Sequence, residues 1–147
     1  MEPLSVRELD LIRAARRAVL ATIAADGAPR LVPITFVFDN DLIYTPLDEK
    51  PKRVADPRDL ARARDIAQRP RVAVLVDAWD EDWTQLGWLR VSGSARLIGP
   101  DGDSAPEHAN AVSLLRARYA QYAGHALETR PVIRIAVERV TSWFAVP

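Results

Sequence analysis

Two lysine side chains are the first candidates for chemistry in this sequence. Lys50 and Lys52 stand one residue apart, and they are the only lysines among 20 basic residues. Pro51 between them stiffens the backbone and lowers the entropy cost of holding both ammonium groups in place. The Lys-Pro-Lys-Arg segment precedes a predicted helix start, which adds free backbone N–H groups and the positive end of a helix dipole. The pattern favours binding of a phosphate or of several carboxylates.

The lysines open a basic segment in a chain whose formal net charge is zero. Residues 50–71 hold eight basic and three acidic residues, a local charge of +5. The basic residues are Lys50, Lys52, Arg53, Arg58, Arg62, Arg64, Arg69 and Arg71. A solvated basic helix and a chance clustering of the lysines are the alternative interpretations. Nucleic-acid binding ranks low, because the aromatic residues lie elsewhere rather than between these charges.

Other catalytic groups are scarce in the sequence. The absence of cysteine excludes disulfides, thiolate metal sites and cysteine nucleophiles. The two histidines, His108 and His125, are expected at the surface, and residues 80–82 are expected to form a solvated acidic turn. No G-x-S-x-G, Walker or G-x-G-x-x-G motif occurs. We therefore assign no side chain a catalytic role and predict no metal site.

Length and charge limit the class of protein. A chain of 147 residues suits one domain, which we expect to span residues 1–147. Zero net charge argues against a dedicated nucleic-acid or membrane-surface partner. The N-terminus shows no targeting pattern and the apolar stretches are only strand-sized, so we expect a cytoplasmic protein.

The first half of the sequence predicts one helix and three strands. Ser5 and Glu8 form a capping box, which begins a helix that runs to about Arg16. Strands are expected at residues 19–24, 31–38 and 42–45, and Asp26–Gly27 is a hairpin turn signal between the first two. This arrangement would be a three-strand antiparallel meander.

The middle of the sequence predicts a helix followed by two strands. Asp56–Pro57 is typical of a helix start, and Arg69–Pro70 would end that helix. The apolar run at residues 72–76 predicts a strand buried on both faces. A longer strand follows at residues 88–98, with Gly93 as a bulge.

The last third predicts one more helix and one strand. Ser104 and Glu107 form a second capping box, and a strand is expected at residues 132–146. The new helix carries an apolar stripe that we expect to pack in the core. Its members are Val112, Leu115, Tyr119 and Tyr122. The whole order predicts a small barrel, mainly β with peripheral helices.

These segments resemble the pyridoxamine-phosphate-oxidase-like split β-barrels over nearly the whole chain. The match begins with Leu20-Ala21-Thr22-Ile23 and Asp26-Gly27-Ala28-Pro29, and it continues through the strands to Val91-Ser92-Gly93-Ser94-Ala95-Arg96-Leu97. The branch that uses the deazaflavin coenzyme F420 is the most similar. Three segments point to it: the Lys50–Arg53 loop, Asp80-Glu81-Asp82-Trp83 and Val140-Thr141-Ser142-Trp143.

The resemblance implies a fold, a cofactor and a set of contacts. The fold would be an FMN-binding-type split β-barrel, built as a homodimer with two sites at the interface. The cofactor would be coenzyme F420, with FMN as the alternative. Its phosphate would be held by Thr45, Lys50 and Lys52, with Arg64 as a further candidate. Backbone groups of Val32, Pro33, Ile34 and Thr35 would bond the polar edge of its ring system.

The implied activity is hydride transfer to or from a small conjugated acceptor. Such a reaction relies on the cofactor for its chemistry, so the lack of a catalytic triad is expected. An FMN oxidase or reductase and a non-catalytic F420 carrier or sensor are the alternatives. Quinones, tetrapyrroles and other conjugated carbonyl compounds all suit a flat apolar pocket.

Overall fold

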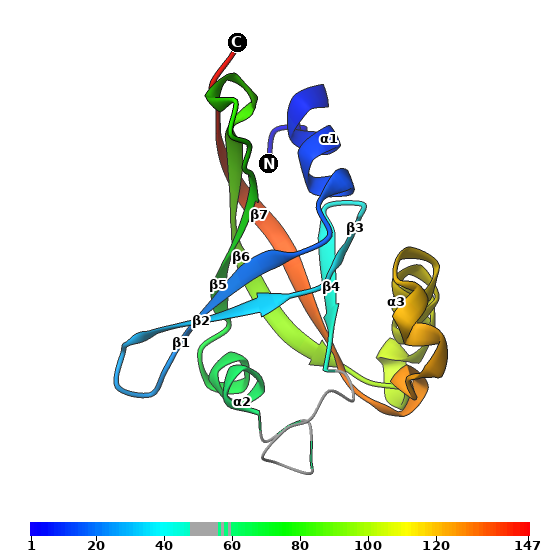
Figure 1. Cartoon of the computed structure of the whole chain (residues 1–147). Helices are drawn as coiled ribbons and strands as arrows, with labels where there is room; N and C mark the ends of the chain where they lie inside the picture. Colours follow the sequence, from blue (N-terminus) through cyan, green and yellow to red (C-terminus); the bar gives the residue numbers. More distant parts are fainter. Residues whose placement is uncertain (48–55, 57, 59) are drawn as a thin grey trace.

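The strands of the computed structural model form one antiparallel sheet that curls into a half-barrel (Figure 1). The structure describes residues 1–47, 56, 58 and 60–147. Within them the helices are α1 (Val6–Ala14), α2 (Ala61–Gln68) and α3 (Ala105–Arg118). The strands are β1 (Ala18–Ile23), β2 (Pro29–Ile34), β3 (Val37–Asp39), β4 (Leu42–Pro46), β5 (Arg71–Ala78), β6 (Gly87–Ile98) and β7 (Val132–Phe144). This confirms a mainly β fold with peripheral helices.

The strand order explains the curl. The order across the sheet is β2-β1-β5-β6-β7-β4-β3, so β2 and β3 occupy opposite edges. Only Thr35 and Phe36 separate these two strands in the chain. A flat seven-stranded sheet could not be bridged by two residues, because neighbouring strands lie about 4.8 Å apart. The sheet must therefore bend until its two edges approach each other.

The corner between β2 and β3 corrects the sequence analysis. Residues 31–38 were expected to form one strand, and the first three strands a meander; both predictions are wrong. The Tyr119 hydroxyl accepts a hydrogen bond from the Phe36 N–H at 3.0 Å and lies 2.8 Å from the Phe36 oxygen. A side chain 83 residues away thus binds both backbone groups that a continuous strand would have given to its neighbour.

Two hairpins flank this corner. Asp26–Gly27 turns β1 into β2 as predicted, with Gly27 at φ +84°. Asn40 and Asp41 both adopt positive φ, which is the backbone that a tight β3–β4 turn requires.

The start of one helix agrees with the sequence prediction, and the starts of the other two differ from it. Ser5 and Glu8 form the predicted capping box of α1. The helix α2 begins at Ala61 rather than at Asp56, because Leu60 has extended backbone (ψ 142°). Asp56 still accepts a hydrogen bond from the Arg58 N–H at 2.9 Å. The second capping box does not form, because the Glu107 carboxylate turns away to Tyr44 and Arg134.

The long β6–β7 pair carries the predicted bulge. The register shifts between Ser92 and Gly93, where a Cβ atom would meet the Ala136 carbonyl oxygen at 2.1 Å. Only glycine allows that approach. The neighbouring β5 differs from expectation, since it is not buried on both faces. Leu75 on its outer face is 42% exposed.

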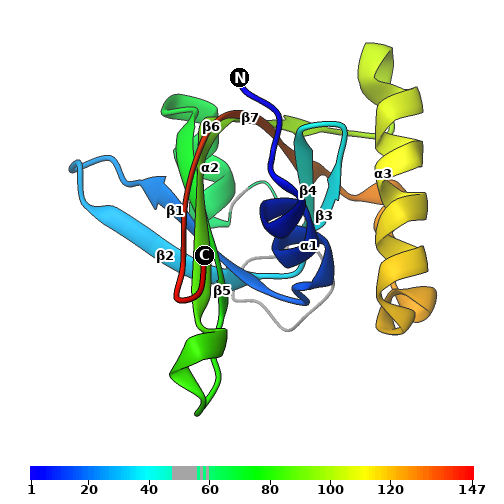
Figure 2. The ribbon, with the colours of Figure 1, turned by 90° about the horizontal axis from the view of Figure 1, so that it is seen from above.

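Side chains fill the two sides of the sheet as separate clusters. The barrel interior holds Leu20, Val74, Leu89 and Ile135, all fully buried. A second cluster lies under α3 and contains the predicted stripe. Its members include Val112, Leu115, Tyr119, Tyr122, Tyr44, Ile98 and Val132. Figure 2 shows α3 at one side of the sheet, well apart from α2.

Among the described helices, none combines the length and apolar character needed to cross a membrane.

Candidate functional site

The predicted phosphate contacts lie within or near the part of the chain that the structure does not describe. Lys50 and Lys52 lie outside the described residues, so their role stays a prediction. Thr45 lies in β4 opposite Ile133 and is only 1% exposed, which leaves almost no side-chain surface for a ligand. Arg64 lies on α2 and is exposed. Of this group, Arg64 is the described residue whose charge is presented to solvent.

A buried carboxylate on the same helix holds α2 against the β1–β2 hairpin. Asp65 accepts hydrogen bonds from the Thr22 hydroxyl at 2.7 Å and from Arg30 Nε at 2.8 Å. Arg69 Nη2 lies 3.8 Å from its second oxygen. Burial raises the pKa of Asp65, but the bonds from Arg30 and Thr22 outweigh it and hold that pKa below its ordinary value.

This cluster changes how the basic segment should be understood. Arg69 is shared with Asp65, and Arg71 pairs with Glu138 at 3.3 Å. Glu138 lies outside residues 50–71, so its ion pair with Arg71 balances part of the local charge of +5, whereas Asp65 is already counted in that sum. Asp65, which the charge count treated as a mere subtraction, is the residue that organises the segment.

The edge strand β2 supplies the backbone groups expected to meet the cofactor ring. Among the described residues β2 pairs with β1 alone, so its outer edge faces away from the sheet. Along it Pro33 is exposed, Val32 and Thr35 are half-buried, and Ile34 is buried. Proline suits such an edge, because it has no N–H to leave unpaired. The four predicted residues are thus contiguous and partly accessible, whereas Thr45 is enclosed.

At the end of this edge lies a pocket that the sequence analysis did not identify. It has a volume of about 620 Å³ and opens beside Thr35. We call it the tyrosine pocket; its lining residues are Arg16, Thr35, Tyr119, Gln121, Tyr122 and His125. The Thr35 and Tyr122 hydroxyl oxygens are 2.6 Å apart. Helical spacing marked the tyrosines as core residues, and nothing in that pattern indicates that they also border a cavity.

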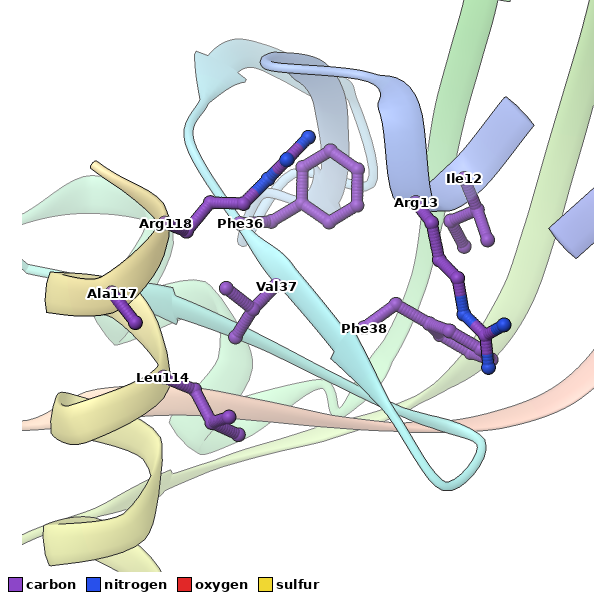
Figure 3. Close-up of a pocket in the computed structure, with 8 residues that line it drawn as sticks. All are labelled: Ile12, Arg13, Phe36, Val37, Phe38, Leu114, Ala117 and Arg118. Carbon is purple, nitrogen blue, oxygen red and sulfur yellow. The ribbon is translucent and has the colours of Figure 1, made fainter. Parts of the chain in front are cut away.

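A second hollow lies on the Phe36 side of the corner (Figure 3). It has a volume of about 320 Å³ and lies between α1, β3 and α3. Phe36, Val37 and Phe38 line it from β3 and the residue before it, while Arg13 and Arg118 reach it from the two helices (Figure 3). Arg118 also donates a hydrogen bond to the Ala15 carbonyl at 2.8 Å. Six of its eight lining residues are apolar, and the Arg118 hydrogen bond links α3 to the residue that ends α1.

A second carboxylate cluster attaches α3 to the sheet. Glu107 accepts hydrogen bonds from the Tyr44 hydroxyl at 2.5 Å and from Arg134 Nε at 2.8 Å. Burial raises the pKa of Glu107, but those two bonds outweigh it and the net shift is downward. Burial and the adjacent carboxylate raise the pKa of Tyr44 well above its ordinary value.

The histidines do not lie where the sequence analysis put them. His108 is 2% exposed, and its Nε2 is 2.7 Å from the Arg130 carbonyl oxygen. His125 is half-buried in the wall of the tyrosine pocket. Over the described part of the chain, no three His, Asp or Glu side chains gather closely enough to hold a metal ion.

Comparisons with known proteins place this geometry in context. A family model described as pyridoxamine 5'-phosphate oxidase matches residues 7–144. A conserved hypothetical protein from Mycobacterium tuberculosis has a similar structure, with 20% identity, a TM-score of 0.75, and coverage of 97% of this chain and 86% of that one.

Two further solved structures with a similar fold are an F420 reductase and a heme storage protein. The F420 reductase is 21% identical, with a TM-score of 0.64 and coverage of 95% of this chain and 98% of that one. The heme storage protein HutZ from Vibrio cholerae is 14% identical, with a TM-score of 0.70 and coverage of 97% and 95%. At these identities the structural matches demonstrate a shared fold.

Proposed function

This chain belongs to the pyridoxamine 5'-phosphate oxidase family, and on that basis we propose that it is an F420-dependent oxidoreductase. The reaction would transfer a hydride between the deazaflavin and a small conjugated organic acceptor. The observation that carries the proposal is the β2 edge: an accessible strand edge that ends at a pocket of about 620 Å³ beside Thr35.

The described residues fit a flat cofactor with an anionic tail. Backbone groups of the β2 edge can bond the polar rim of a ring system, as an extra strand would. Arg64 on α2 offers an exposed cation on the helix that follows the two lysines in the chain. When bound, a deazaflavin supplies the hydride chemistry, and the protein supplies position and electrostatics.

The lysine pair would complete the phosphate site. Each ammonium would make a charge-assisted contact worth roughly 1.5–3 kcal/mol. Their pairing in a chain that otherwise uses arginine suggests a site fitted to a compact ammonium rather than to a planar guanidinium.

A homodimer is part of this proposal. The outer face of β1, β2 and β5 carries exposed apolar side chains, among them Leu31 at 68% and Leu75 at 42%. Val19 lies opposite Leu75 and Ala21 opposite Leu31, so these side chains form one continuous surface. An exposed apolar surface of this kind favours self-association. Sedimentation should give twice the 16.3 kDa chain mass, and a stable monomer at micromolar concentration would contradict the dimer.

The test of the proposed cofactor is a direct titration. The purified protein is titrated with F420 and with FMN, and binding is followed by absorbance and fluorescence. We expect F420 to bind more tightly, because the positive charges of residues 50–71 suit its phosphate and its oligoglutamate tail. Equal or tighter binding of FMN would favour the FMN alternative. Tight F420 binding with no hydride transfer to any conjugated carbonyl acceptor would favour a carrier or sensor, a possibility that the heme storage neighbour makes worth testing.

Variants locate the phosphate contacts in the same assay. Lys50→Ala or Lys52→Ala should weaken F420 binding by roughly tenfold to a hundredfold. Lys52→Arg should also lose affinity, although it keeps the charge. Arg139→Ala removes an exposed cation from β7, outside the predicted site, and should leave the affinity unchanged. If both alanine variants bind as tightly as the wild type, the phosphate site lies elsewhere.

A further inference from the structure

The walls of the tyrosine pocket are held in place before any ligand arrives. The Tyr119 hydroxyl lies within 3.0 Å of backbone atoms of Arg16, which lines the pocket, and of Phe36, which follows the lining residue Thr35. The short 3-10 helix at residues 120–124 is fixed from α3, because Arg116 donates to the Tyr122 carbonyl at 3.1 Å and to the His125 carbonyl at 2.6 Å. A site that is already ordered costs a ligand little conformational entropy.

The aromatic rings of the pocket are arranged edge to face. Tyr119 and Tyr122 have ring centroids 5.7 Å apart at an interplanar angle of 70°. Tyr122 and His125 have centroids 5.2 Å apart at 77°. These three rings form an aromatic part of the pocket lining. Such walls favour a planar, polarisable ligand, because aromatic groups pack best in offset or edge-to-face geometry.

The charge of the lining has one sign. Arg16 is a permanent cation, with its guanidinium carbon 5.9 Å from the Tyr119 ring centroid. None of the six described lining residues is acidic. The Thr35 and Tyr122 hydroxyls add hydrogen-bonding groups on the side next to β2. An oxygen anion on the ligand would be attracted here, whereas a cationic ligand would be repelled.

The tyrosine pocket lies next to the residues to which the cofactor ring is assigned, where a second ligand could meet the cofactor. Thr35 lines the pocket and directly follows Ile34, the last residue of β2, and it is also the last of the four residues to which the cofactor ring is assigned. A volume of about 620 Å³ is enough for a ligand of two or three fused rings, within the usual range of small-molecule sites.

We infer that the tyrosine pocket binds the acceptor, and that the acceptor is a planar conjugated carbonyl compound carrying a carboxylate. Its ring system lies among Tyr119, Tyr122 and His125, and its carboxylate faces Arg16. The assignment as acceptor rests on the proposed function; binding of an aromatic carboxylate does not.

The test uses a matched pair of probes and no cofactor. 2-Naphthoate and 2-naphthamide share the same ring and differ in charge, and their binding is measured by calorimetry and by ligand-observed NMR. The wild type should bind 2-naphthoate about tenfold more tightly than 2-naphthamide, since a charge-assisted contact is worth at least that factor. Equal affinities, or no binding at millimolar concentration, would overturn the inference.

Adjacent arginines provide the control variants. Arg16→Ala should lose about tenfold for 2-naphthoate and nothing for 2-naphthamide. Arg17→Ala removes an exposed cation next in the chain that does not line the pocket, and it should change neither affinity. Tyr122→Trp fills the cavity and should abolish binding of both probes. If that variant does not fold, Gln121→Trp blocks the same cavity from an exposed position.

A final titration separates this inference from the proposed function. In the presence of saturating F420, 2-naphthoate should still bind, because the pocket lies beside the cofactor edge rather than on it. Competition between the two ligands would overturn the acceptor assignment. If 2-naphthoate binds as expected but F420 does not bind at all, the proposed function fails while the pocket and its ligand class stand.

Discussion

The helices α2 and α3 are attached to the sheet by the same chemical device, yet they depend on it to different degrees. In each case a helix carboxylate accepts one bond from a hydroxyl of a strand and one from an arginine Nε. For Asp65 these donors are Thr22 and Arg30. For Glu107 they are Tyr44 and Arg134. Figures 1 and 2 place the two helices at different sides of the sheet.

The two attachments differ in the apolar surface that supports them. The helix α2 has eight residues, and its buried apolar side chains are those of Ala63 and Ile66. The helix α3 has 14 residues and buries Ala111, Val112 and Leu115 in the second core cluster. The Asp65 side chain is 5% exposed, whereas the Glu107 side chain is 27% exposed. The helix α2 is therefore held to the sheet mainly by a buried polar cluster, and α3 mainly by its apolar contacts in the second core cluster.

The largest effect is expected from Asp65→Ala. It leaves Thr22 and Arg30 without their shared acceptor, and it removes the polar anchor of a helix with little apolar support. We expect a loss of about 2 to 4 kcal/mol in the free energy of unfolding. Urea denaturation checks this, with Glu2→Gln, an exposed acidic residue near the N-terminus, as the control. A loss below that of the corresponding Glu107 variant would break the comparison.

A smaller effect is expected from Glu107→Gln. The amide can still accept one hydrogen bond, the site is partly solvated, and the buried face of α3 is unchanged. We expect a loss of about 1 kcal/mol, as for a single hydrogen bond to a charged group near the surface. The same denaturation series measures it. Tyr44→Phe should cost a similar amount, and adding it to Glu107→Gln should cost less than the sum, because the two residues share one bond.

The smallest expected effect is the pH dependence of the free energy of unfolding. Both carboxyl groups have a folded-state pKa below the unfolded values of 3.8 for Asp65 and 4.5 for Glu107. A lowered pKa in the folded state stabilises the protein above the unfolded pKa, and the contribution is lost as the pH falls through the folded value. The stability gap between the wild type and Asp65→Asn or Glu107→Gln should therefore be constant near neutral pH.

That gap should begin to narrow as the pH falls to the unfolded pKa, which is 4.5 for Glu107 and 3.8 for Asp65, so the narrowing should begin first for Glu107. Urea denaturation repeated at several pH values between 7 and 3 measures the change. A gap that widens on acidification would show that the two carboxylates are not stabilising as anions, which would remove the basis of the comparison.

Several errors of the sequence analysis share one cause. The capping box at Ser5–Glu8 formed, but the same pattern at Ser104–Glu107 did not, because Tyr44 and Arg134 offered Glu107 stronger partners. His108 looked like a surface residue in the first turn of a helix, yet it contacts the Arg130 carbonyl. In both cases an interaction with a residue distant in the sequence replaced the one that the local pattern predicted.

The part of the candidate site that could be predicted consists of residues consecutive in the sequence. The resemblance assigned backbone groups of Val32, Pro33, Ile34 and Thr35 to the cofactor ring; the structure has the first three in the edge strand β2 and Thr35 directly after it, and their role toward a cofactor stays a prediction. The tyrosine pocket was not predictable, because it joins Arg16, Thr35 and the 119–125 segment across the fold. The burial of Thr45 likewise depends on the pairing of β4 with β7.

The sequence by itself determined the features that depend on interactions between residues close together in the chain. The Asp26–Gly27 turn, the Ser5–Glu8 capping box and the mainly β pattern follow from backbone preferences and from side chains within a few positions of each other. The tertiary structure alone decided the break at Thr35–Phe36, the neutralisation of Arg30 and Arg69 by Asp65, and the cavity beside Thr35. The physical reason is that a buried polar group must find a partner wherever the fold supplies one. Here those partners came from residues that no local pattern connects.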